Sequence, residues 1–400
     1  MNQIFSDIQQ ARNNIDSLVQ NTQYAESITL SKLLSCRVYL KFENHQFTGS
    51  FKERGALNCI LSMNEKERSK GVIAASAGNH AQGLAYHANK LGIRSVIVMP
   101  KIAPQVKVTH PRSLGAEVIL HGENFDAANE HALKLAKEEG LIYIHPYDDL
   151  KVIAGQGTIA LEMLEVTPDL DAILVPIGGG GLISGIAVAA KAINPEIKVY
   201  GVESAHFNSM YAHVKGLEPS FGATTIADGI AVKNPGVLTS EIVAKSVDDI
   251  FLVEEDDIEE AMILLLEIEK TLVEGAGATG LAALKKNASL LKGKKVGLIL
   301  CGGNVDPLTL TAVIDKGMVR AGRLVRLNVQ MTDMPGSLSA VSQIFGECNA
   351  NIDEVHFQRT FTPLPIQRVD VEFSLKTRDH QHIEDIILAL SKSGFTAVKV

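Results

Sequence analysis

Short apolar runs alternate with helical segments between residues 70 and 300, and this alternation restricts the possible folds more than any other feature of the sequence. The apolar runs are Gly71–Ala75, Ser95–Met99, Glu117–His121, Ile142–His145, Ala172–Ile177, Lys198–Glu203 and Lys295–Cys301. Helical segments such as His80–Leu91, Phe125–Glu139 and Asp257–Thr271 fall between them. Buried strands that alternate with helices indicate βαβ units and a parallel sheet with helices on both faces. We therefore expect an α/β fold that binds ligands at the carboxyl ends of its strands.

One uncharged stretch, Ala172–Ala190, is 19 residues long, which is nearly the length of a membrane span. It contains Pro176 and five glycines, four of them consecutive at Gly178–Gly181. A glycine run of this kind forms a poor helix and would leave backbone groups unsatisfied in lipid. The stretch is better interpreted as a buried strand over Ala172–Ile177, a glycine loop and a helix from about Leu182.

The composition is that of a globular protein without a basic surface. The chain has 400 residues, 46% of them hydrophobic and 21% charged, which predicts two or three domains. Its net charge of −8, with no basic block, argues against nucleic acid as a partner. The four cysteines form no CxxC pair, which suits a reducing compartment and argues against structural zinc. No signal peptide is visible, so we expect a cytoplasmic protein that does not enter a membrane.

The last eighty residues have a different pattern. Leu324–Met331 and Arg368–Leu375 alternate strictly between apolar and polar residues, which is typical of half-buried strands in an antiparallel sheet. The remaining segments of this region are two helices, Ser337–Cys348 and Ile383–Ser393, and two short strands, Ile352–Arg359 and Thr396–Val400. The order β-α-β-β-α-β predicts a ferredoxin-like domain, with a boundary near Met318–Arg323.

Lys52 is the first candidate for chemistry. Ser50 and Glu53 have the spacing of a capping box, which would place Lys52 in the first turn of a helix. The positive end of the helix dipole lowers the basicity of an amine there, as an amine that forms a Schiff base requires. The alternative is an ordinary exposed lysine, and this motif alone does not exclude it.

The run Gly178–Gly181 is the second candidate. A glycine loop between a buried strand and a helix presents free N–H groups and the positive end of a dipole, which together suit a phosphate. The run matches neither the dinucleotide fingerprint nor the P-loop. A tight turn is the structural alternative, but two glycines would suffice for a turn.

Two further loops lie at predicted strand ends. The loop Ser76–His80 offers a hydroxyl, an amide and helix N–H groups that could hold a carboxylate or a phenolic oxygen. Ser76 could also simply cap the following helix. The loop Cys301–Asn304 could equally be a buried strand end. Combined with a lysine and a phosphate loop in one domain, these loops suggest a phosphate-bearing aldehyde cofactor.

The order and spacing of these segments give a specific resemblance. Residues 20–310 resemble the fold-type II pyridoxal-phosphate enzymes, in particular the threonine dehydratases (threonine ammonia-lyases). The segments that carry it are Lys41–Glu43, Ser50–Ala56, Ser76–Gly83, Gly178–Leu182 and Cys301–Asn304. Residues 325–400, with Asp333–Leu338, resemble an ACT regulatory domain. The resemblance implies a catalytic domain over 1–320, with a small subdomain inserted at roughly 48–150, and an ACT domain over 325–400.

The resemblance also implies roles for the residues that bind the cofactor, pyridoxal 5'-phosphate. Lys52 would hold it as a Schiff base and then act as the base on the α-carbon of the substrate. Phe51 would pack beside the ring, Asn79 would hydrogen-bond the phenolic oxygen, and Cys301 would face the pyridine nitrogen. The backbone N–H groups that would cradle the phosphate belong to Gly178, Gly179, Gly180, Gly181 and Leu182. The loop that would bind the substrate carboxylate consists of Ser76, Ala77, Gly78 and His80.

The reaction implied is elimination of the hydroxyl and the amino group of L-threonine, which gives 2-oxobutanoate and ammonia. L-Serine would give pyruvate as a secondary activity. Serine racemases have a second serine where this chain has Ala77, so racemisation should be slow. Around Glu203 the chain has Phe207 and Ser209 in place of the racemases' metal-binding residues, so no divalent metal is expected, although a monovalent cation near Glu203 is possible.

The ACT resemblance implies pairing through sheet edges, hence a homodimer or homotetramer, with an amino acid bound between copies. Asp333, Gly336 and Asn351 occupy the turn positions where the family binds effectors, and isoleucine or valine are the first candidates. Serine dehydratase, 3-hydroxyaspartate dehydratase and a weak serine racemase stay open as alternative enzymes. A non-enzymatic amino-acid sensor with a degenerate catalytic domain is the alternative from a different class.

Overall fold

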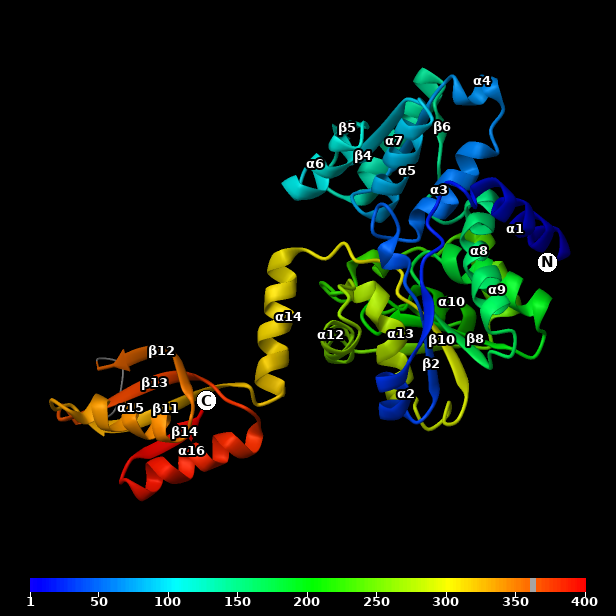
Figure 1. The fold of residues 1–400 in the computed structure, drawn as a ribbon. Coiled ribbons are helices and arrows are strands. Elements are labelled where there is room, and N and C mark those ends of the chain that lie inside the picture. The colour runs from blue at the N-terminus through cyan, green and yellow to red at the C-terminus, as the bar shows by residue number, and fades with distance from the viewer. Residues whose placement is uncertain (360–364) are drawn as a thin grey trace. The chain divides into compact units, whose positions relative to one another are not determined.

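The computed structural model describes residues 1–359 and 365–400 (Figure 1). The chain forms two compact units, Met1–Val305 and Asp306–Val400. Two sheets build the first unit and one builds the second. The α/β class with mostly parallel sheets, followed by a smaller antiparallel domain, is confirmed.

The larger sheet of the first unit has six strands in the order β1-β2-β10-β7-β8-β9. Their bounds are Tyr24–Ser27 for β1, Arg37–Lys41 for β2, Ala172–Pro176 for β7, Lys198–Ser204 for β8, Asp249–Val253 for β9 and Lys295–Ile299 for β10. All neighbours are parallel except β1, which pairs antiparallel with β2 at the edge. Three of these strands, β1, β2 and β9, were not among the predicted apolar runs.

Helices pack closely on this sheet. α13 contacts β7, β8, β9 and β10, while α9 contacts β7 and β8 and lies against α8. The main helices of this layer are α1 (Asn2–Ile15), α8 (Leu150–Val166), α9 (Gly181–Ile193), α11 (Val237–Ser246), α12 (Glu255–Leu264) and α13 (Gly275–Lys286). The shorter ones are α2 (Ile28–Leu34), η1 (Glu43–His45), α10 (Ser209–Lys215), η2 (Asp228–Ile230) and the π-helix η3 (Leu265–Glu269). The predicted segment Asp257–Thr271 is therefore an α-helix that continues into a π-turn.

The smaller sheet is parallel throughout, in the order β5-β4-β3-β6. Its strands are β3 (Val72–Ala75), β4 (Ser95–Met99), β5 (Glu117–Leu120) and β6 (Ile142–Tyr143), and its helices are α3 (Lys52–Leu61), α4 (Glu65–Arg68), α5 (Asn79–Lys90), α6 (Gln105–Ser113) and α7 (Phe125–Glu139). Alternate residues of β3 enter two separate cores, one with α3 and α5 and one with α7. Helices therefore cover both faces of this sheet, as the continuous apolar runs predict.

The second unit contains α14 and a four-stranded antiparallel sheet in the order β12-β13-β11-β14. Its elements are α14 (Pro307–Arg320), β11 (Leu324–Thr332), α15 (Ser337–Glu347), β12 (Asn351–Gln358), β13 (Arg368–Lys376), α16 (His380–Lys392) and β14 (Thr396–Lys399). The predicted order β-α-β-β-α-β is confirmed. The alternation in β13 places Val369, Val371, Phe373 and Leu375 in the core. α14 groups with this unit, and the expected boundary at Met318–Arg323 lies at its carboxyl end.

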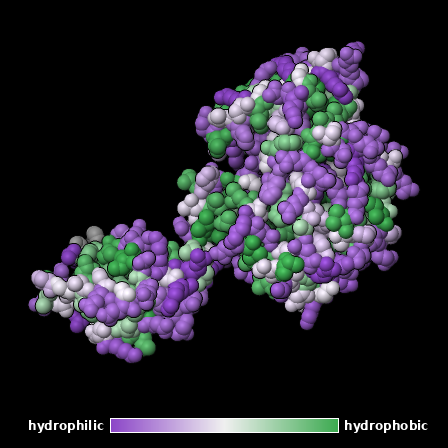
Figure 2. All heavy atoms as spheres, in the orientation of Figure 1, coloured by the Kyte–Doolittle hydropathy of each residue, from purple (hydrophilic) through white to green (hydrophobic). Residues whose placement is uncertain are grey.

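Among the residues that the structure describes, no helix is both long enough and apolar enough to span a bilayer. The uncharged stretch Ala172–Ala190 instead forms β7, a glycine loop and most of α9, as the sequence predicts. On the face drawn in Figure 2, hydrophilic residues predominate and apolar residues form separate patches.

Four buried charges hold the start of α3 against the larger sheet. Arg54 donates to Glu43 over 2.7 and 2.8 Å and to Glu162 over 2.6 and 3.0 Å. Lys41 Nζ lies 2.6 Å from Glu162. Arg54, Lys41 and Glu43 are inaccessible to solvent, and two cations balance two carboxylates. Because Arg54 follows Lys52 by two residues, this network fixes the position of Lys52 relative to β2 and α8.

Replacing Arg54 with Ala should lower the free energy of unfolding by about 3–5 kcal/mol, because it leaves two buried carboxylates to share the single charge of Lys41. Urea denaturation followed by circular dichroism measures this loss. Arg94 is a matched control, because it also bridges two glutamates, Glu117 and Glu139, but in solvent. Arg94→Ala should cost about 1 kcal/mol or less, and equal losses for the two variants would contradict the importance of the buried network.

Candidate functional site

Lys52 is the first residue of α3, as predicted, but the predicted capping box is wrong. Phe51 occupies the N-cap position without a side-chain cap, and Ser50 forms a β-bridge with Gly302 instead. The Glu53 carboxylate accepts hydrogen bonds from the backbone N–H and hydroxyl of Thr48, over 2.9 and 2.8 Å. Because the backbone of Ser50 pairs with Gly302 in the loop after β10, Ser50 does not occupy the N-cap position of α3.

The Lys52 amine donates to the Pro146 carbonyl oxygen over 3.0 Å. Burial lowers the pKa of Lys52 to about 8, although Cys301 and Glu274 nearby oppose this shift. The Nζ atom lies 5.4 Å from the centroid of the Phe51 ring. About a tenth of this amine is therefore neutral and nucleophilic at pH 7, far more than for a lysine in water.

Tyr147, the residue after Pro146, packs directly on the glycine loop. A Cβ atom at Gly179 would lie 2.2 Å from the ring of Tyr147, so only glycine fits there. Gly180 has φ +94° and caps α9, which also favours glycine. Pro146 thus contacts Lys52 while the next residue contacts the loop, which brings the amine and the glycine run to one place.

The N–H groups and the carbonyl groups of the glycine loop differ in their hydrogen bonding. Among the described residues, no protein acceptor takes the N–H groups of residues 178–182. The carbonyl of Gly179, in contrast, accepts from the Thr239 hydroxyl over 2.7 Å. These residues lie at the N-terminus of α9, whose dipole favours an anion. The loop has the donor set of a phosphate site.

The loop Ser76–His80 leads from β3 into α5. Gly78 occupies the N-cap, and its N–H donates to the Ser76 hydroxyl over 3.2 Å. His80 is buried, and its Nε2 lies 3.0 Å from the Ile144 carbonyl oxygen, so Nε2 carries the proton. Burial lowers the pKa of His80 to about 3, which keeps the imidazole neutral. Its side chain is therefore fixed inside the unit, and Ala77 packs at the edge of the core.

Cys301 follows β10, and its carbonyl accepts the Phe51 N–H over 3.1 Å. The side chain is buried, and burial raises the pKa of the Cys301 thiol well above its ordinary value. Its thiol stays protonated and uncharged. Asn79, from the Ser76–His80 loop, donates to Glu274 over 2.8 Å and accepts from Asn304 over 2.6 Å. The loops predicted at the strand ends therefore meet in the structure.

Glu274, Pro146 and Tyr147 were missed in the sequence. Glu274 had a signal that could have been used, because it is the only charged residue between Thr271 and Leu284 and precedes Gly-Ala-Gly. A lone carboxylate in such an apolar run is buried and needs a partner. Pro146 contributes only a backbone carbonyl, for which residue type gives no signal.

The predicted effector residues do not all come together within one chain. Asp333 and Gly336 share the loop between β11 and α15. Lys376 of β13 lies opposite both Leu324, the first residue of β11, and Asn351. Because β11 spans nine residues, Asp333 and Asn351 lie about 30 Å apart along the sheet. A ligand that touches both ends needs a second copy of this unit.

Glu203 lies in β8 and supports a helix. Its carboxylate accepts the N–H groups of Met210 and Tyr211 over 3.0 and 2.7 Å, in the first turn of α10. Burial raises the pKa of Glu203 to about 8. Within residues 1–359 and 365–400, no group of three or more His, Cys, Asp or Glu side chains could hold a metal ion. The monovalent cation near Glu203 stays a prediction.

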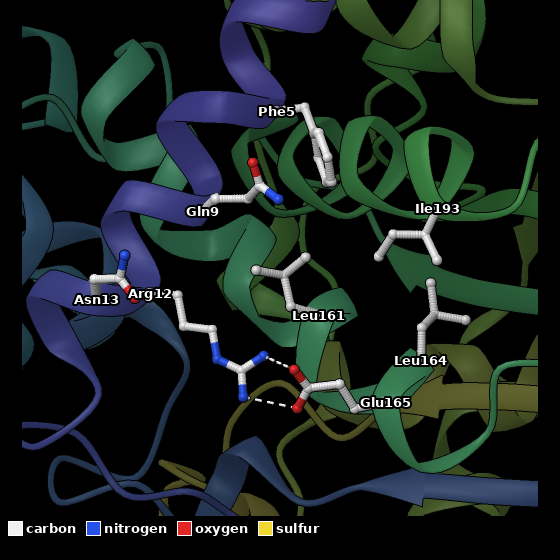
Figure 3. A pocket seen from close by; sticks show the side chains of 8 residues that line it. All are labelled: Phe5, Gln9, Arg12, Asn13, Leu161, Leu164, Glu165 and Ile193. Atoms are coloured by element: carbon white, nitrogen blue, oxygen red, sulfur yellow. Dashed lines mark hydrogen bonds and ion pairs between the residues drawn. The ribbon is translucent and has the colours of Figure 1, made fainter.

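A separate cavity of about 530 Å³ lies beside α1, α8 and the end of α9 (Figure 3). Its lining residues are Phe5, Gln9, Arg12, Asn13, Leu161, Leu164, Glu165 and Ile193. Arg12 and Glu165 form an ion pair across it, and apolar side chains face the same space. None of the predicted site residues lines this cavity.

Comparison with known proteins agrees with the geometry. The family model described as "Pyridoxal-phosphate dependent enzyme" matches residues 15–302. The chain belongs to the pyridoxal-phosphate dependent enzymes. It is 46% identical over 391 residues to an L-threonine ammonia-lyase of Thermotoga maritima, and the match covers 97% of each chain.

Solved structures of the family have the same fold. The processed form of threonine deaminase isoform 2 from Solanum lycopersicum is 35% identical, with a TM-score of 0.76 over 80% of this chain and 89% of that one. A serine racemase from Dictyostelium discoideum is 39% identical, with a TM-score of 0.71 over 76% of this chain and 98% of that one. Both fold type II and dependence on pyridoxal phosphate are thus confirmed.

The residues present fit this cofactor. Lys52 offers an amine with a lowered pKa, the glycine loop offers unpaired N–H groups, and Cys301 offers an uncharged thiol. Asn79 has a second N–H on Nδ2 beyond the one given to Glu274. These groups match, respectively, the aldehyde, the phosphate, the pyridine nitrogen and the phenolic oxygen of pyridoxal phosphate.

Attachment of pyridoxal phosphate to the cofactor-free protein should accelerate about tenfold per pH unit below the pKa of Lys52 and level off above it, because only the neutral amine attacks an aldehyde. With that pKa at about 8, the rate should level off near pH 8. Stopped-flow absorbance measures this profile. Lys70→Ala, which changes an exposed lysine, should leave it unchanged. A rate that still rises toward the pKa of a free lysine, about 10.4, would contradict the lowered pKa.

Proposed function

We propose that this chain is an L-threonine ammonia-lyase, which converts L-threonine to 2-oxobutanoate and ammonia and L-serine more slowly to pyruvate. The observation that carries the proposal is the buried Lys52 amine, which donates to the carbonyl of Pro146, the residue before the tyrosine that packs on the glycine loop. The 46% identity to an L-threonine ammonia-lyase over nearly the whole chain supports the same reaction. We place the enzyme in the cytoplasm, which suits its four free cysteines.

Bound pyridoxal phosphate supplies the electron-withdrawing ring that acidifies the α-carbon of an amino acid. Lys52 would anchor this group and would accept the α-proton of the substrate on Nζ. The N–H groups of Gly178, Gly179, Gly180, Gly181 and Leu182 hold the phosphate, and Phe51 packs beside the ring. Asn79 donates a hydrogen bond to the phenolic oxygen.

Cys301 selects between reactions in this proposal. Its buried thiol carries no charge, so it cannot keep the pyridine nitrogen protonated as a carboxylate would. A ring without that proton would stabilise negative charge on the α-carbon poorly, which would favour loss of the β-hydroxyl, protonated to water as it leaves, over other outcomes. Ala77 brings no second group for proton transfer, so elimination is favoured over racemisation.

The substrate carboxylate binds at the start of α5 in this proposal. Ala77, Gly78, Asn79 and His80 lie at the N-terminal end of that helix, where the dipole favours an anion, and the N–H groups of Ala77, Asn79 and His80 are the donors proposed for the carboxylate. The Ser76 hydroxyl accepts from Gly78 and holds the loop in shape. The side chain of His80 stays neutral and buried behind it.

Within the second unit, residues 325–400 are proposed to form an ACT domain. The catalytic domain is proposed to span residues 1–320, with its small subdomain over roughly 48–150. The role of the ACT domain is to bind isoleucine or valine between two copies, because Asp333 and Gly336 lie at one end of its sheet and Asn351 at the other. The protein is then a homodimer or homotetramer.

The purified protein supplied with pyridoxal phosphate should release 2-oxobutanoate from L-threonine faster than pyruvate from L-serine. Lys52→Ala should lower turnover about a thousandfold or more, since it removes both the anchor and the base, whereas Lys70→Ala should not. A coupled keto-acid assay measures both. Release from serine alone would change the substrate, and full activity of Lys52→Ala would refute the mechanism.

Isoleucine or valine should change the threonine saturation curve of the full chain, and Asp333→Ala should weaken that response about tenfold, because it removes one charged contact. Asp385→Ala, an exposed aspartate of α16, is the control and should leave the response intact. The response is measured as the rate of 2-oxobutanoate release at increasing isoleucine concentrations for each variant. An unchanged response in Asp333→Ala would place the effector elsewhere.

A further inference from the structure

A chain of hydrogen bonds through two side-chain amides, those of Asn304 and Asn79, lies in the candidate site. The Asn304 amide nitrogen donates to the Thr48 carbonyl oxygen over 2.9 Å and to Asn79 Oδ1 over 2.6 Å. The Asn79 amide nitrogen donates to Glu274 Oε1 over 2.8 Å. The chain therefore runs from a backbone carbonyl to a carboxylate, with both amides between them.

The two ends of the chain fix the orientation of both amides. A backbone carbonyl can only accept, so the Asn304 Nδ2 atom must face Thr48. The same nitrogen then faces Asn79, which must present its oxygen to it. The Asn79 nitrogen is left on the other side, where the Glu274 carboxylate accepts one of its two hydrogens. A flipped Asn79 would face a donor with a donor and an acceptor with an acceptor.

Glu274 is placed for this contact and not for a helix cap. It occupies the N-cap position of α13, but its side chain does not cap that helix. Glu274 is only 4% exposed, and it also accepts the backbone N–H of Asn304. A Cβ atom at Gly302 would lie 2.3 Å from Glu274 Oε1, so the glycine leaves room for the carboxylate. Two donors thus converge on one buried carboxylate.

We propose that Glu274 and Asn304 are positioning residues that lock the Asn79 amide, so that its remaining N–H donates to the phenolic oxygen of bound pyridoxal phosphate. This inference rests on the proposed function and deepens it. Neither residue needs to touch the cofactor, because each acts through Asn79. The carboxylate is required, because it accepts from both Asn79 and the backbone N–H of Asn304. An amide at position 274 has only one acceptor oxygen, so its own N–H₂ group would face one of these two donors.

The test is the affinity of the cofactor-free protein for pyridoxal phosphate, measured by titration of its visible absorbance. The variants are Glu274→Gln, Asn304→Ala, Asn79→Ala and the two doubles that combine Asn79→Ala with each of the others. Above the pKa of Glu274, which burial raises to about 7, each single variant should weaken binding about tenfold, the value of one charge-assisted hydrogen bond. Each double should bind no more weakly than Asn79→Ala alone, because the residues act through the same amide.

Two outcomes would overturn the inference. One is binding by Glu274→Gln and Asn304→Ala that equals that of the unaltered protein. The other is a further tenfold loss when Glu274→Gln is added to Asn79→Ala, which would mean that Glu274 acts on the cofactor directly. Glu241→Gln, an exposed glutamate of α11, is the matched control and should bind normally.

Folding and the proposed function are tested separately. Thermal unfolding of each cofactor-free variant identifies any that are unfolded. Glu274→Gln, which keeps the shape of the side chain, and Asn304→Ala test the inference independently, so it can still be tested if one of them does not fold. If the unaltered protein neither binds pyridoxal phosphate nor releases 2-oxobutanoate, the proposed function fails. If it does both and the variants bind it equally well, the inference about Glu274 and Asn304 fails alone.

Discussion

The hydrogen bond from the Lys52 amine to the Pro146 carbonyl holds the candidate site together. It joins the start of α3 to the segment after β6, whose next residue, Tyr147, packs on the glycine loop. Burial of the amine both positions it and makes it less basic. A single contact thus relates the Lys52 amine, the glycine loop and the packing of the smaller sheet.

The surrounding structure keeps this contact in place. The network around Arg54 anchors α3 to β2 and α8, and Asp148 accepts the N–H groups of Val237 and Thr239 at the start of α11. Thr239 in turn holds the carbonyl of Gly179. The reactive groups themselves are few, and buried polar contacts on several sides fix their positions.

The sequence predicts much of this fold because buried parallel strands are continuous apolar runs. The strands β3, β4 and β7 and the helix α7 appear close to their expected bounds, and the loops after β3 and β10 meet through Asn79 and Asn304. The edge strand β1 and its neighbour β2 lack such a run. The capping box failed because Ser50 pairs with Gly302, a residue 252 positions away in the chain, and local spacing does not reveal distant pairing. The role of Pro146 could not be predicted either, because it contributes a backbone carbonyl, which every residue type has.

The arrangement of β11, β12 and β13 sets a condition on regulation. Asp333 and Asn351 lie at opposite ends of one sheet, so a small molecule that uses both must bridge two chains. Its affinity would then depend on protein concentration as well as on its own chemistry. Dilution would weaken the response while leaving catalysis within each chain intact, and a measured effector constant would describe the assembly, not the single chain.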